Sequence, residues 1–272
     1  MSGTELPPLL LVGCGKMGGA MLAGWLERGL RDTVVVEPNP AAAAAFAGRV
    51  RVVGTPAEVP GDVRPAAVVL AIKPQEAGAT LPGLSRFVGP GTAFLSIMAG
   101  QTVAGIRAKL GDGEAVVVRA MPNTPAAVRQ GFTVAFPAPG VSPAQRGLAD
   151  SLLTSVGEVA WVEDEGLLDP VTAVSGGGPA YVFLLAEVME AAAVEQGLPP
   201  DLARRMARAT VAGSGALLAA SAEDAAALRR AVTSPKGTTE RALQVLMAPE
   251  AWPKLMSRAI EAATARSREL AG

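Results

Sequence analysis

Apolar and polar positions divide the chain into two parts with different periodicities. In the first part, short apolar runs typical of buried strands alternate with stretches of helical periodicity. The runs predicted as strands are Leu9–Val12, Thr33–Glu37, Val50–Val53, Ala66–Ile72, Ala93–Ile97, Ala115–Val118 and, at the edge, Gly131–Phe136. The helical stretches between them include Ala20–Arg28, Ala41–Ala47, Thr102–Leu110 and Pro143–Val156. This alternation predicts an α/β fold with a parallel sheet covered on both faces.

After about Glu163 the strand signals end, and only helical patterns remain. The expected helices are Leu167–Val174, Ala180–Gln196, Pro200–Ala220, Ala222–Val232, Thr239–Met247 and Ala251–Leu270. The third helix carries the small residues Ala212–Ala216, which cost helix stability unless another helix approaches closely. We therefore expect an α/β domain over residues 1–163 and an all-helical domain over residues 164–272, with part of the helical surface buried against another subunit.

The first predicted strand leads directly into a glycine pattern, and a helix follows it. In a dinucleotide-binding Rossmann turn, the first glycine allows a tight turn, the second lets the backbone approach a pyrophosphate, and the third lets the helix pack on the strand. The N–H groups at the start of the helix then face the phosphates. The cofactor-binding candidates here are Gly13, Cys14, Gly15, Lys16, Met17 and Gly18. The alternative is an ordinary glycine turn in a doubly wound sheet.

Four more segments rich in Gly, Pro, Asn or Thr follow predicted strands: Glu37–Asn39, Lys73-Pro74, Met98–Gly100 and Met121–Pro125. Ligands collect beyond the carboxyl ends of parallel strands, so we expect these segments to face the cofactor. Both Glu37 and Asn39 are therefore cofactor-binding candidates. A carboxylate at Glu37 accepts hydrogen bonds from the adenine-ribose hydroxyls and repels a 2′-phosphate, which favours NADH. Arg49 or another loop could still reach a 2′-phosphate.

Composition excludes several kinds of chemistry. The 272 residues contain 24 Lys and Arg against 25 Asp and Glu, a formal net charge of −1, so no nucleic-acid partner is expected. Histidine is absent, which excludes a histidine general acid, a Ser-His-Asp triad and a histidine-ligated metal. We therefore expect no metal site.

Cysteine usage and the apolar segments bear on location. The single cysteine, Cys14, cannot form an intrachain disulfide, which fits a reducing cytoplasm. Residues 1–8 lack the basic region of a signal peptide. The apolar stretch Pro179–Val194 carries Glu187 and Glu190, so no membrane span is expected.

The helical part contains two motifs that could bind an anion. Ser175–Tyr181 is a glycine loop that opens a helix. Thr233–Thr239 places hydroxyls and backbone N–H groups at the start of another helix, an arrangement that can hold a carboxylate. The alternative for this second motif is a helix N-cap, by Ser234 or Thr238, without any ligand.

Together these motifs resemble those of the pyrroline-5-carboxylate reductases of proline biosynthesis. The matching stretches, in the family's order, are VGCGKMGGAMLAG, AIKPQ, RAMPNTPAAVRQGFT, AVSGGGPAYVF and VTSPKGTTERAL. The resemblance implies a Rossmann domain followed by a helical dimerisation domain. Helices of two subunits interlock in the homodimer, so that each active site is completed across it, and decamers built from dimers also occur. The implied reaction is hydride transfer from NADPH or NADH to the cyclic imine of 1-pyrroline-5-carboxylate, giving L-proline.

The resemblance also implies roles for single residues. Gly13 to Gly18 would hold the pyrophosphate. The resemblance places further residues along the path to the nicotinamide and on the cofactor side: Lys73, Pro74, Ala99, Gly100, Asn123 and Glu165. The residues implied for the substrate carboxylate are Ser234, Gly237 and Thr238. Thr239 would hydrogen-bond the ring nitrogen as an orienting group and proton relay, since imine reduction leaves no oxyanion to protonate.

The chain departs from the family's usual pattern at three positions. Lys236 stands where glycine is usual, which puts the loop geometry in question if that position needs a positive φ. Gly177 stands where a second serine is common, and this removes one hydroxyl. Glu37 replaces a smaller polar residue, which weakens the inference to NADPH.

Two other functions remain open. A 3-hydroxyacid dehydrogenase of the 6-phosphogluconate type shares the glycine opening and a helical second domain, but Ala180–Gln196 lacks the lysine that such enzymes use. A non-catalytic nucleotide-sensing protein would bind the cofactor without turnover. The complete set of Ser234, Thr238 and Thr239 counts against this second alternative.

Overall fold

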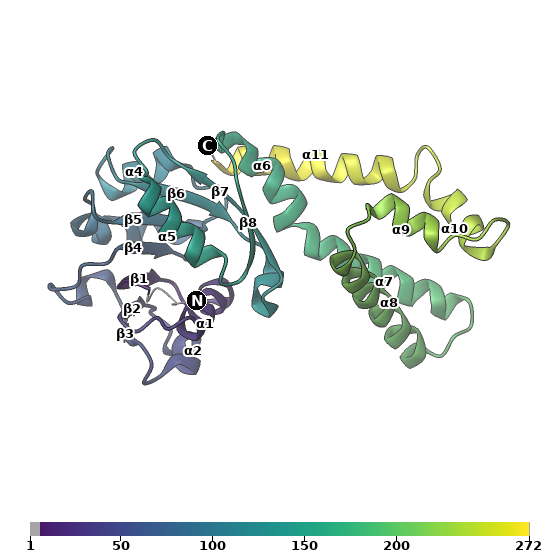
Figure 1. Cartoon of the computed structure of the whole chain (residues 1–272), viewed down its shortest axis with the longest axis horizontal. Coiled ribbons are helices and arrows are strands. Elements are labelled where there is room, and N and C mark those ends of the chain that lie inside the picture. The colour runs from purple at the N-terminus through teal and green to yellow at the C-terminus, as the bar shows by residue number, and fades with distance from the viewer. Residues whose placement is uncertain (1–5, 272) are drawn as a thin grey trace. The chain divides into compact units, whose positions relative to one another are not determined.

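The computed structural model describes residues 6–271, so the first five residues of the N-terminal stretch discussed above lie outside the described part. By its internal packing the chain forms two units, Met1–Gly176 with Ala263–Gly272, and Gly177–Ala262. Residues 164–176 pack with the α/β unit, whereas the expected helical domain begins at residue 164. Figure 1 labels the strands and most of the α-helices of both units.

The first unit is built around one eight-stranded sheet with the order β3-β2-β1-β4-β5-β6-β7-β8. The strands are β1 (Leu9–Val12), β2 (Thr33–Val36), β3 (Arg51–Val53), β4 (Ala67–Leu70), β5 (Ala93–Ser96), β6 (Val117–Met121), β7 (Gly131–Pro137) and β8 (Gly157–Trp161). Neighbouring strands are parallel except for β6 and β7. This confirms the expected Rossmann-type sheet, and its order reverses between β1 and β4, where doubly wound sheets bind ligands.

The strand β8 corrects the expectation that strands end at Phe136 and that β7 lies at the edge. It pairs in parallel with β7, from Gly131 opposite Gly157 to Ala135 opposite Trp161. Every residue of β8 is partly or fully exposed, so the segment lacks the continuous apolar run that reveals the other strands. The predicted helix Pro143–Val156 accordingly ends earlier, at Leu153.

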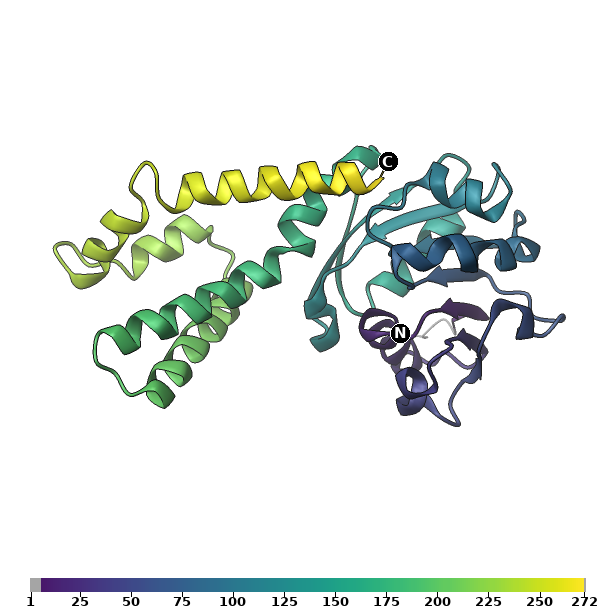
Figure 2. The ribbon, with the colours of Figure 1, turned by 180° about the vertical axis from the view of Figure 1, so that it is seen from behind.

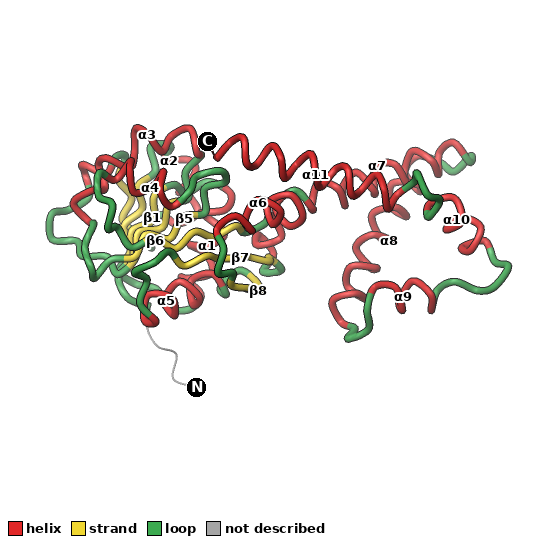
Figure 3. Tube along the Cα trace, turned by 90° about the horizontal axis from the view of Figure 1, so that it is seen from above, coloured by secondary structure: helices red, strands yellow, loops and turns green. Residues whose placement is uncertain are grey.

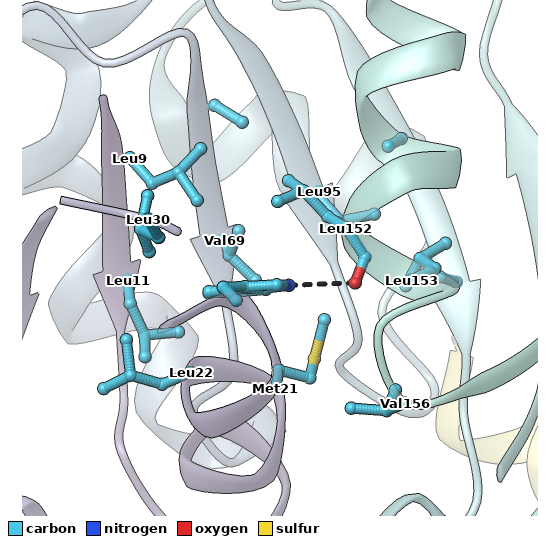
Figure 4. Close-up of a cluster of buried hydrophobic side chains, with 14 of the residues drawn as sticks. Leu9, Leu11, Met21, Leu22, Leu30, Val69, Leu95, Leu152, Leu153 and Val156 are labelled. Carbon is cyan, nitrogen blue, oxygen red and sulfur yellow. Dashed lines mark hydrogen bonds between the residues drawn. The ribbon is translucent and has the colours of Figure 1, made fainter. Parts of the chain in front are cut away.

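Helices cover both faces of the sheet, because successive strand residues point to opposite sides (Figure 3). On one face, α1 (Lys16–Glu27) and α5 (Pro143–Leu153) pack on the strands, and the indole N–H of Trp25 donates to the carbonyl oxygen of Leu152 at 2.8 Å (Figure 4). On the other face lie the 3₁₀ helix η4 (Leu81–Phe87) and α4 (Val103–Leu110). Shorter helices of this unit are α2 (Pro40–Ala43), η1 (Ala44–Phe46), η2 (Pro56–Glu58), η3 (Pro74–Glu76), α3 (Ala77–Thr80), η5 (Thr124–Val128), η6 (Glu165–Leu167), α6 (Leu168–Val171) and the π-helix η7 (Thr172–Gly176).

The second unit is entirely helical, as expected. Its elements are α7 (Gly178–Glu195), α8 (Pro200–Ala220), α9 (Ala225–Ala231), α10 (Thr238–Leu246) and most of α11 (Trp252–Ala271), and α7 lies beside α8 (Figure 2). Within residues 177–262 only Ala203 and Ala207 are buried. Large apolar side chains are exposed instead, for example Phe183 at 69% and Leu217 at 68%. Apolar helices with this exposure require another surface to cover them.

One helical stretch, Glu165–Glu195, is long and apolar enough to cross a membrane by length and composition alone, and it is the only such stretch among the described residues. It includes the exposed apolar residues of α7. The expectation that the chain does not span a membrane therefore stays a prediction.

Candidate functional site

The glycine turn between β1 and α1 has the tight geometry that the sequence predicts. Gly13 has a φ of +92°, and a Cβ atom there would lie 2.6 Å from the carbonyl oxygen of Ala71, just beyond β4. A Cβ atom on Gly18 would lie 2.3 Å from the carbonyl oxygen of Gly13. Both positions therefore need glycine, Gly13 for its backbone conformation and Gly18 for the close packing of α1 on the turn.

Gly15, by contrast, is not required to be glycine by the packing of its own unit. Its φ is −68°, which any residue can adopt, and a Cβ atom there would meet nothing within 4 Å. It is the N-cap residue of α1, and no side chain caps this twelve-residue helix. The open space therefore lies at an uncapped helix N-terminus, which fits the pyrophosphate of a dinucleotide.

The carboxylate of Glu37 fixes this turn from the end of β2. Its Oε2 accepts a hydrogen bond from the N–H of Cys14 at 2.7 Å, and its Oε1 accepts one from the N–H of Asn39 at 2.9 Å. Asn39 also caps α2, since its Oδ1 accepts from the N–H of Ala41 at 3.1 Å. Each carboxylate oxygen keeps a second lone pair, so Glu37 can still accept hydrogen bonds from ribose hydroxyls. The structure thus brings the glycine turn, Glu37 and Asn39 together.

The thiol of Cys14 is buried within the turn. Burial and, to a lesser extent, the charge of Glu37 raise the pKa of this thiol from 9.0 to about 11. The thiol is therefore neutral near pH 7 and is a poor nucleophile. The side chain of Cys14 therefore serves to pack the turn.

The segment after β4 borders the glycine turn, because Ala71 contacts Gly13. The N–H of Lys73 donates to Oε2 of Glu76 at 3.3 Å, and Pro74 begins η3. The Lys73 side chain is exposed.

The turn after β5 contains Ala99, which is exposed, and Gly100, which is buried. Gly100 has a φ of +69°, and a Cβ atom there would lie 3.3 Å from Cβ of Leu270 in the last turn of α11. That end of α11 belongs to the first unit, where Oγ of Ser267 donates to Oδ1 of Asp169 at 2.7 Å. The C-terminal turns of the chain therefore pack against this predicted cofactor segment.

Asn123 joins two of the motifs found in the sequence. Its Nδ2 donates to Oγ of Ser175 at 3.1 Å, and its Oδ1 accepts from the N–H of Phe132 at 2.9 Å. Ser175 lies in the π-helix η7, a type of irregularity that is frequent at functional sites. The sequence analysis notes the glycine loop that begins at Ser175 but does not predict this contact.

Glu165 lies at the start of η6 and reaches the start of α4. Its Oε1 accepts from the N–H of Val103 at 2.8 Å and from Nη1 of Arg119 at 3.0 Å. Arg119, in β6, is only 4% exposed. The sequence analysis does not single out Arg119 as a site residue, although a lone arginine directly after the apolar run Ala115–Val118 is a recognisable signal.

The predicted substrate loop lies in the second unit, before α10. Lys236 adopts a φ of +59°, so the chain forms the left-handed conformation there without glycine, and its N–H donates to Oε2 of Glu240 at 2.9 Å. Gly237 is the N-cap residue, and no side chain caps α10. The alternative of an N-cap by Ser234 or Thr238 is therefore not what forms.

The hydroxyls of this loop are free to meet a ligand. Ser234, Thr238 and Thr239 are exposed, and none of their side chains hydrogen-bonds to any residue in 6–271. A helix N-terminus with three available hydroxyls suits a carboxylate.

A cavity of about 640 Å³ in the first unit, lined by Gly24, Arg129 and Phe132 among others, contains none of the predicted site residues. Across the described part of the chain, no group of three or more His, Cys, Asp or Glu could hold a metal ion.

Two family models match parts of the chain. The family model described as pyrroline-5-carboxylate reductase dimerisation matches residues 165–270, and the model described as NADP oxidoreductase, coenzyme F420-dependent, matches residues 9–100. The first match begins close to the expected domain boundary at residue 163, while the packing division falls at Gly176. The boundary at residue 163 therefore stays a prediction.

Relatives of the full length are found among curated proteins and solved structures. A pyrroline-5-carboxylate reductase from Pseudomonas aeruginosa is 38% identical over 97% of both chains. The structure of one from Coxiella burnetii has a TM-score of 0.89 and 31% identity, covering 98% of this chain and 100% of that one. A Plasmodium falciparum pyrroline carboxylate reductase with NADP bound, 24% identical with a TM-score of 0.82 over 99% of this chain and 100% of that one, shares the fold. The chain belongs to the pyrroline-5-carboxylate reductase family.

Proposed function

We propose that the chain reduces 1-pyrroline-5-carboxylate to L-proline, with NADH or NADPH as the reductant. The observation that carries the proposal is the loop Ser234–Thr239, an uncapped helix N-terminus with three exposed hydroxyls. The chain also contains a glycine turn at the uncapped N-terminus of α1, and this turn fits a dinucleotide. Family membership favours this reaction over that of a 3-hydroxyacid dehydrogenase.

The cofactor, when bound, supplies the hydride. Gly13–Gly18 bind the pyrophosphate through backbone N–H groups at the start of α1. Glu37 and Asn39 hold the adenine ribose. The remaining cofactor-side residues are Lys73, Pro74, Ala99, Gly100, Asn123 and Glu165, of which Glu165 acts through its bond to the start of α4 and not by contact with the cofactor.

The substrate is held and protonated by the loop before α10. Ser234, Gly237 and Thr238 bind its carboxylate through hydroxyl and N–H groups. The Thr239 hydroxyl hydrogen-bonds the ring nitrogen and relays the proton that this nitrogen gains on reduction. The remaining contribution is proximity and orientation, because the imine carbon must lie against the nicotinamide.

The assembly forms part of the same proposal. The dimerisation match and the exposed apolar faces of α7 and α8 support a homo-oligomer. We infer that helices of two subunits interlock, that each active site takes residues from both subunits, and that dimers can associate further into decamers. A cytoplasmic location, without nucleic-acid or membrane partners, completes the proposal.

The reaction is tested by measuring the oxidation of NADH and of NADPH side by side with 1-pyrroline-5-carboxylate. Turnover with either cofactor supports the reaction, and the ratio of the two kcat/KM values shows whether Glu37 selects against the 2′-phosphate. Nucleotide binding without turnover would instead support the sensing protein.

The shared active site is tested by mixing two inactive variants, one altered at Gly18 and one at Thr239. If each site takes the glycine turn from one subunit and the loop from the other, half of the randomly paired dimers carry one intact site. Activity should then return to about a quarter of the wild-type value. No recovery after subunit exchange, confirmed by mass spectrometry of the mixed dimers, would place each site within one chain.

A further inference from the structure

The turn that contains Ala99 and Gly100 is short, and its two ends are anchored differently. At the end of β5, Oγ of Ser96 accepts from the N–H of Met98 at 3.3 Å. At the other end, α4 begins at Val103, only three residues after Gly100. The position of the turn therefore depends directly on where α4 begins.

The start of α4 has two independent hydrogen-bond acceptors. The side chain of Thr102 caps the helix in the usual way, since its Oγ1 accepts from the N–H of Gly105 at 3.1 Å. Glu165, which follows Val103 by 62 residues in the chain, accepts from the N–H of Val103 at 2.8 Å. Because the helix already has its own N-cap, the second acceptor serves mainly to hold the helix start in place.

Glu165 is in turn held by the sheet. Its Oε1 also accepts from Nη1 of Arg119 at 3.0 Å, and the exposed fractions of the two side chains are 27% and 5%. Arg119 lies in β6 directly opposite Ser96 of β5, the residue that anchors the other end of the turn. A charge-assisted bond to a buried guanidinium is stronger and better defined than an exposed one. The two neighbouring strands thus fix both ends of the turn.

We propose that Arg119 and Glu165 are positioning residues for hydride transfer. They fix the start of α4, and through it the Ala99–Gly100 turn, relative to the sheet that carries the cofactor. This inference rests on the proposed function, which places that turn beside the nicotinamide. A displacement of about 1 Å at the reacting atoms can lower the rate about 10²-fold, so loss of this contact should affect catalysis more than cofactor binding.

The test compares Glu165→Gln and Glu165→Ala with Glu27→Gln. Glu27 forms an ion pair of similar length in the same unit, with Arg129 at 2.8 Å, but it lies in α1 and not beside the Ala99–Gly100 turn. We expect kcat to fall about 10²-fold in Glu165→Ala and less in Glu165→Gln, which keeps an oxygen acceptor for Val103. The dissociation constant of NADPH, measured by fluorescence titration, should change less than about twofold, and so should every quantity in Glu27→Gln.

Two further readouts separate positioning from a general loss of stability. The primary deuterium isotope effect with NADPH labelled at the transferred position should increase in the Glu165 variants, because misplacement slows the hydride step itself. Amide hydrogen exchange in residues 98–104 should become faster in the Glu165 variants and not in Glu27→Gln. The exchange measurement needs no substrate, so it tests the anchoring of the turn even if the wild-type protein fails to reduce 1-pyrroline-5-carboxylate.

Three results would overturn the inference. Unchanged exchange in residues 98–104 of Glu165→Ala would show that Glu165 does not hold the turn. An active wild type whose kcat and isotope effect are unaffected by Glu165→Gln would show that the anchoring does not matter for catalysis. A large loss of NADPH affinity with unchanged kcat would make Glu165 a binding residue. If Glu165→Ala does not fold, Glu165→Gln, with nearly the same side-chain volume, carries the test alone.

Discussion

The two predicted ligand-binding loops differ in how their surroundings hold them. The glycine turn at Gly13–Gly18 is enclosed by its own unit, with close backbone contacts on two glycines and a carboxylate bonded to the N–H of Cys14. The loop Ser234–Thr239 also starts a helix, but its hydroxyls are exposed and its unit buries only Ala203 and Ala207. The first unit thus fixes its predicted cofactor loop by its own packing, whereas the predicted substrate loop of the second unit is left exposed by the packing of its own unit.

The largest expected effect comes from placing a charge on the exposed apolar surface of the second unit. Leu217 in α8 is 68% exposed. If this surface is covered in the homo-oligomer, Leu217→Glu buries an unpaired carboxylate at each copy of the interface. We expect the dimer to be weakened by about 4 kcal/mol, so that its dissociation constant, measured by analytical ultracentrifugation, rises roughly 10³-fold.

The matched control is Val52→Glu in β3, at the outer edge of the sheet, where the side chain is 38% exposed. This variant should keep the wild-type oligomeric state. A dimer that is equally stable in both variants would contradict the contrast between the two units.

The second prediction compares two glycines of the same turn. Gly18→Ala forces a Cβ atom against the carbonyl oxygen of Gly13, at 2.3 Å before any adjustment. It should lower the free energy of unfolding of the first unit by about 3 kcal/mol, seen as a lower Tm without cofactor. Gly15→Ala meets no atom within 4 Å, so it should leave the Tm unchanged and weaken only cofactor binding. Equal losses of Tm would mean that Gly15 is structural as well.

The third prediction concerns the exposed hydroxyls of the second unit. Thr239→Ala should lower kcat/KM by about 10²-fold while cofactor affinity stays nearly unchanged, because the proposed role of the hydroxyl is to act on the ring nitrogen of the substrate. The control is Thr233→Ala, since the hydroxyl of Thr233 already donates to the carbonyl oxygen of Arg229 at 2.6 Å. Stopped-flow measurement of both variants gives the comparison, and full activity of Thr239→Ala would remove this residue from the mechanism.

The two units also differ in how much of their structure can be predicted from the sequence. The buried strands of the first unit are predictable from continuous apolar runs, and the turn is predictable from its glycine spacing. Both signals lie in residues that are close together in the sequence. The strand β8 has no buried residue and escapes detection. The contacts of Glu165 escape it too, because Val103 and Arg119 lie 62 and 46 residues away in the chain, and only the fold brings them together.

In the second unit the sequence predicts the helices well and their environment poorly. The helix starts near Thr238 and Trp252 agree with the expected ones to within one residue. The periodicity of a helix shows which face is apolar, but it does not show what covers that face. The motif resemblance supplies that information, and the dimerisation match supports it.

The smallest expected effect comes from a comparison of Lys236, with a φ of 59°, and Arg129, with a φ of 60°, the two non-glycine residues within 6–271 that have a positive φ. Left-handed backbone costs a side-chain-bearing residue about 1 kcal/mol. Arg129 offsets that cost, because its guanidinium donates to the carbonyl oxygen of Ala20 at 3.0 Å and pairs with Glu27 at 2.8 Å. The ammonium of Lys236 has no partner within residues 6–271. Lys236→Gly should therefore raise the Tm slightly, and Arg129→Gly should lower it, as measured by calorimetry. Tm shifts of the same sign would show that the bonds of Arg129 do not offset the cost of its left-handed backbone.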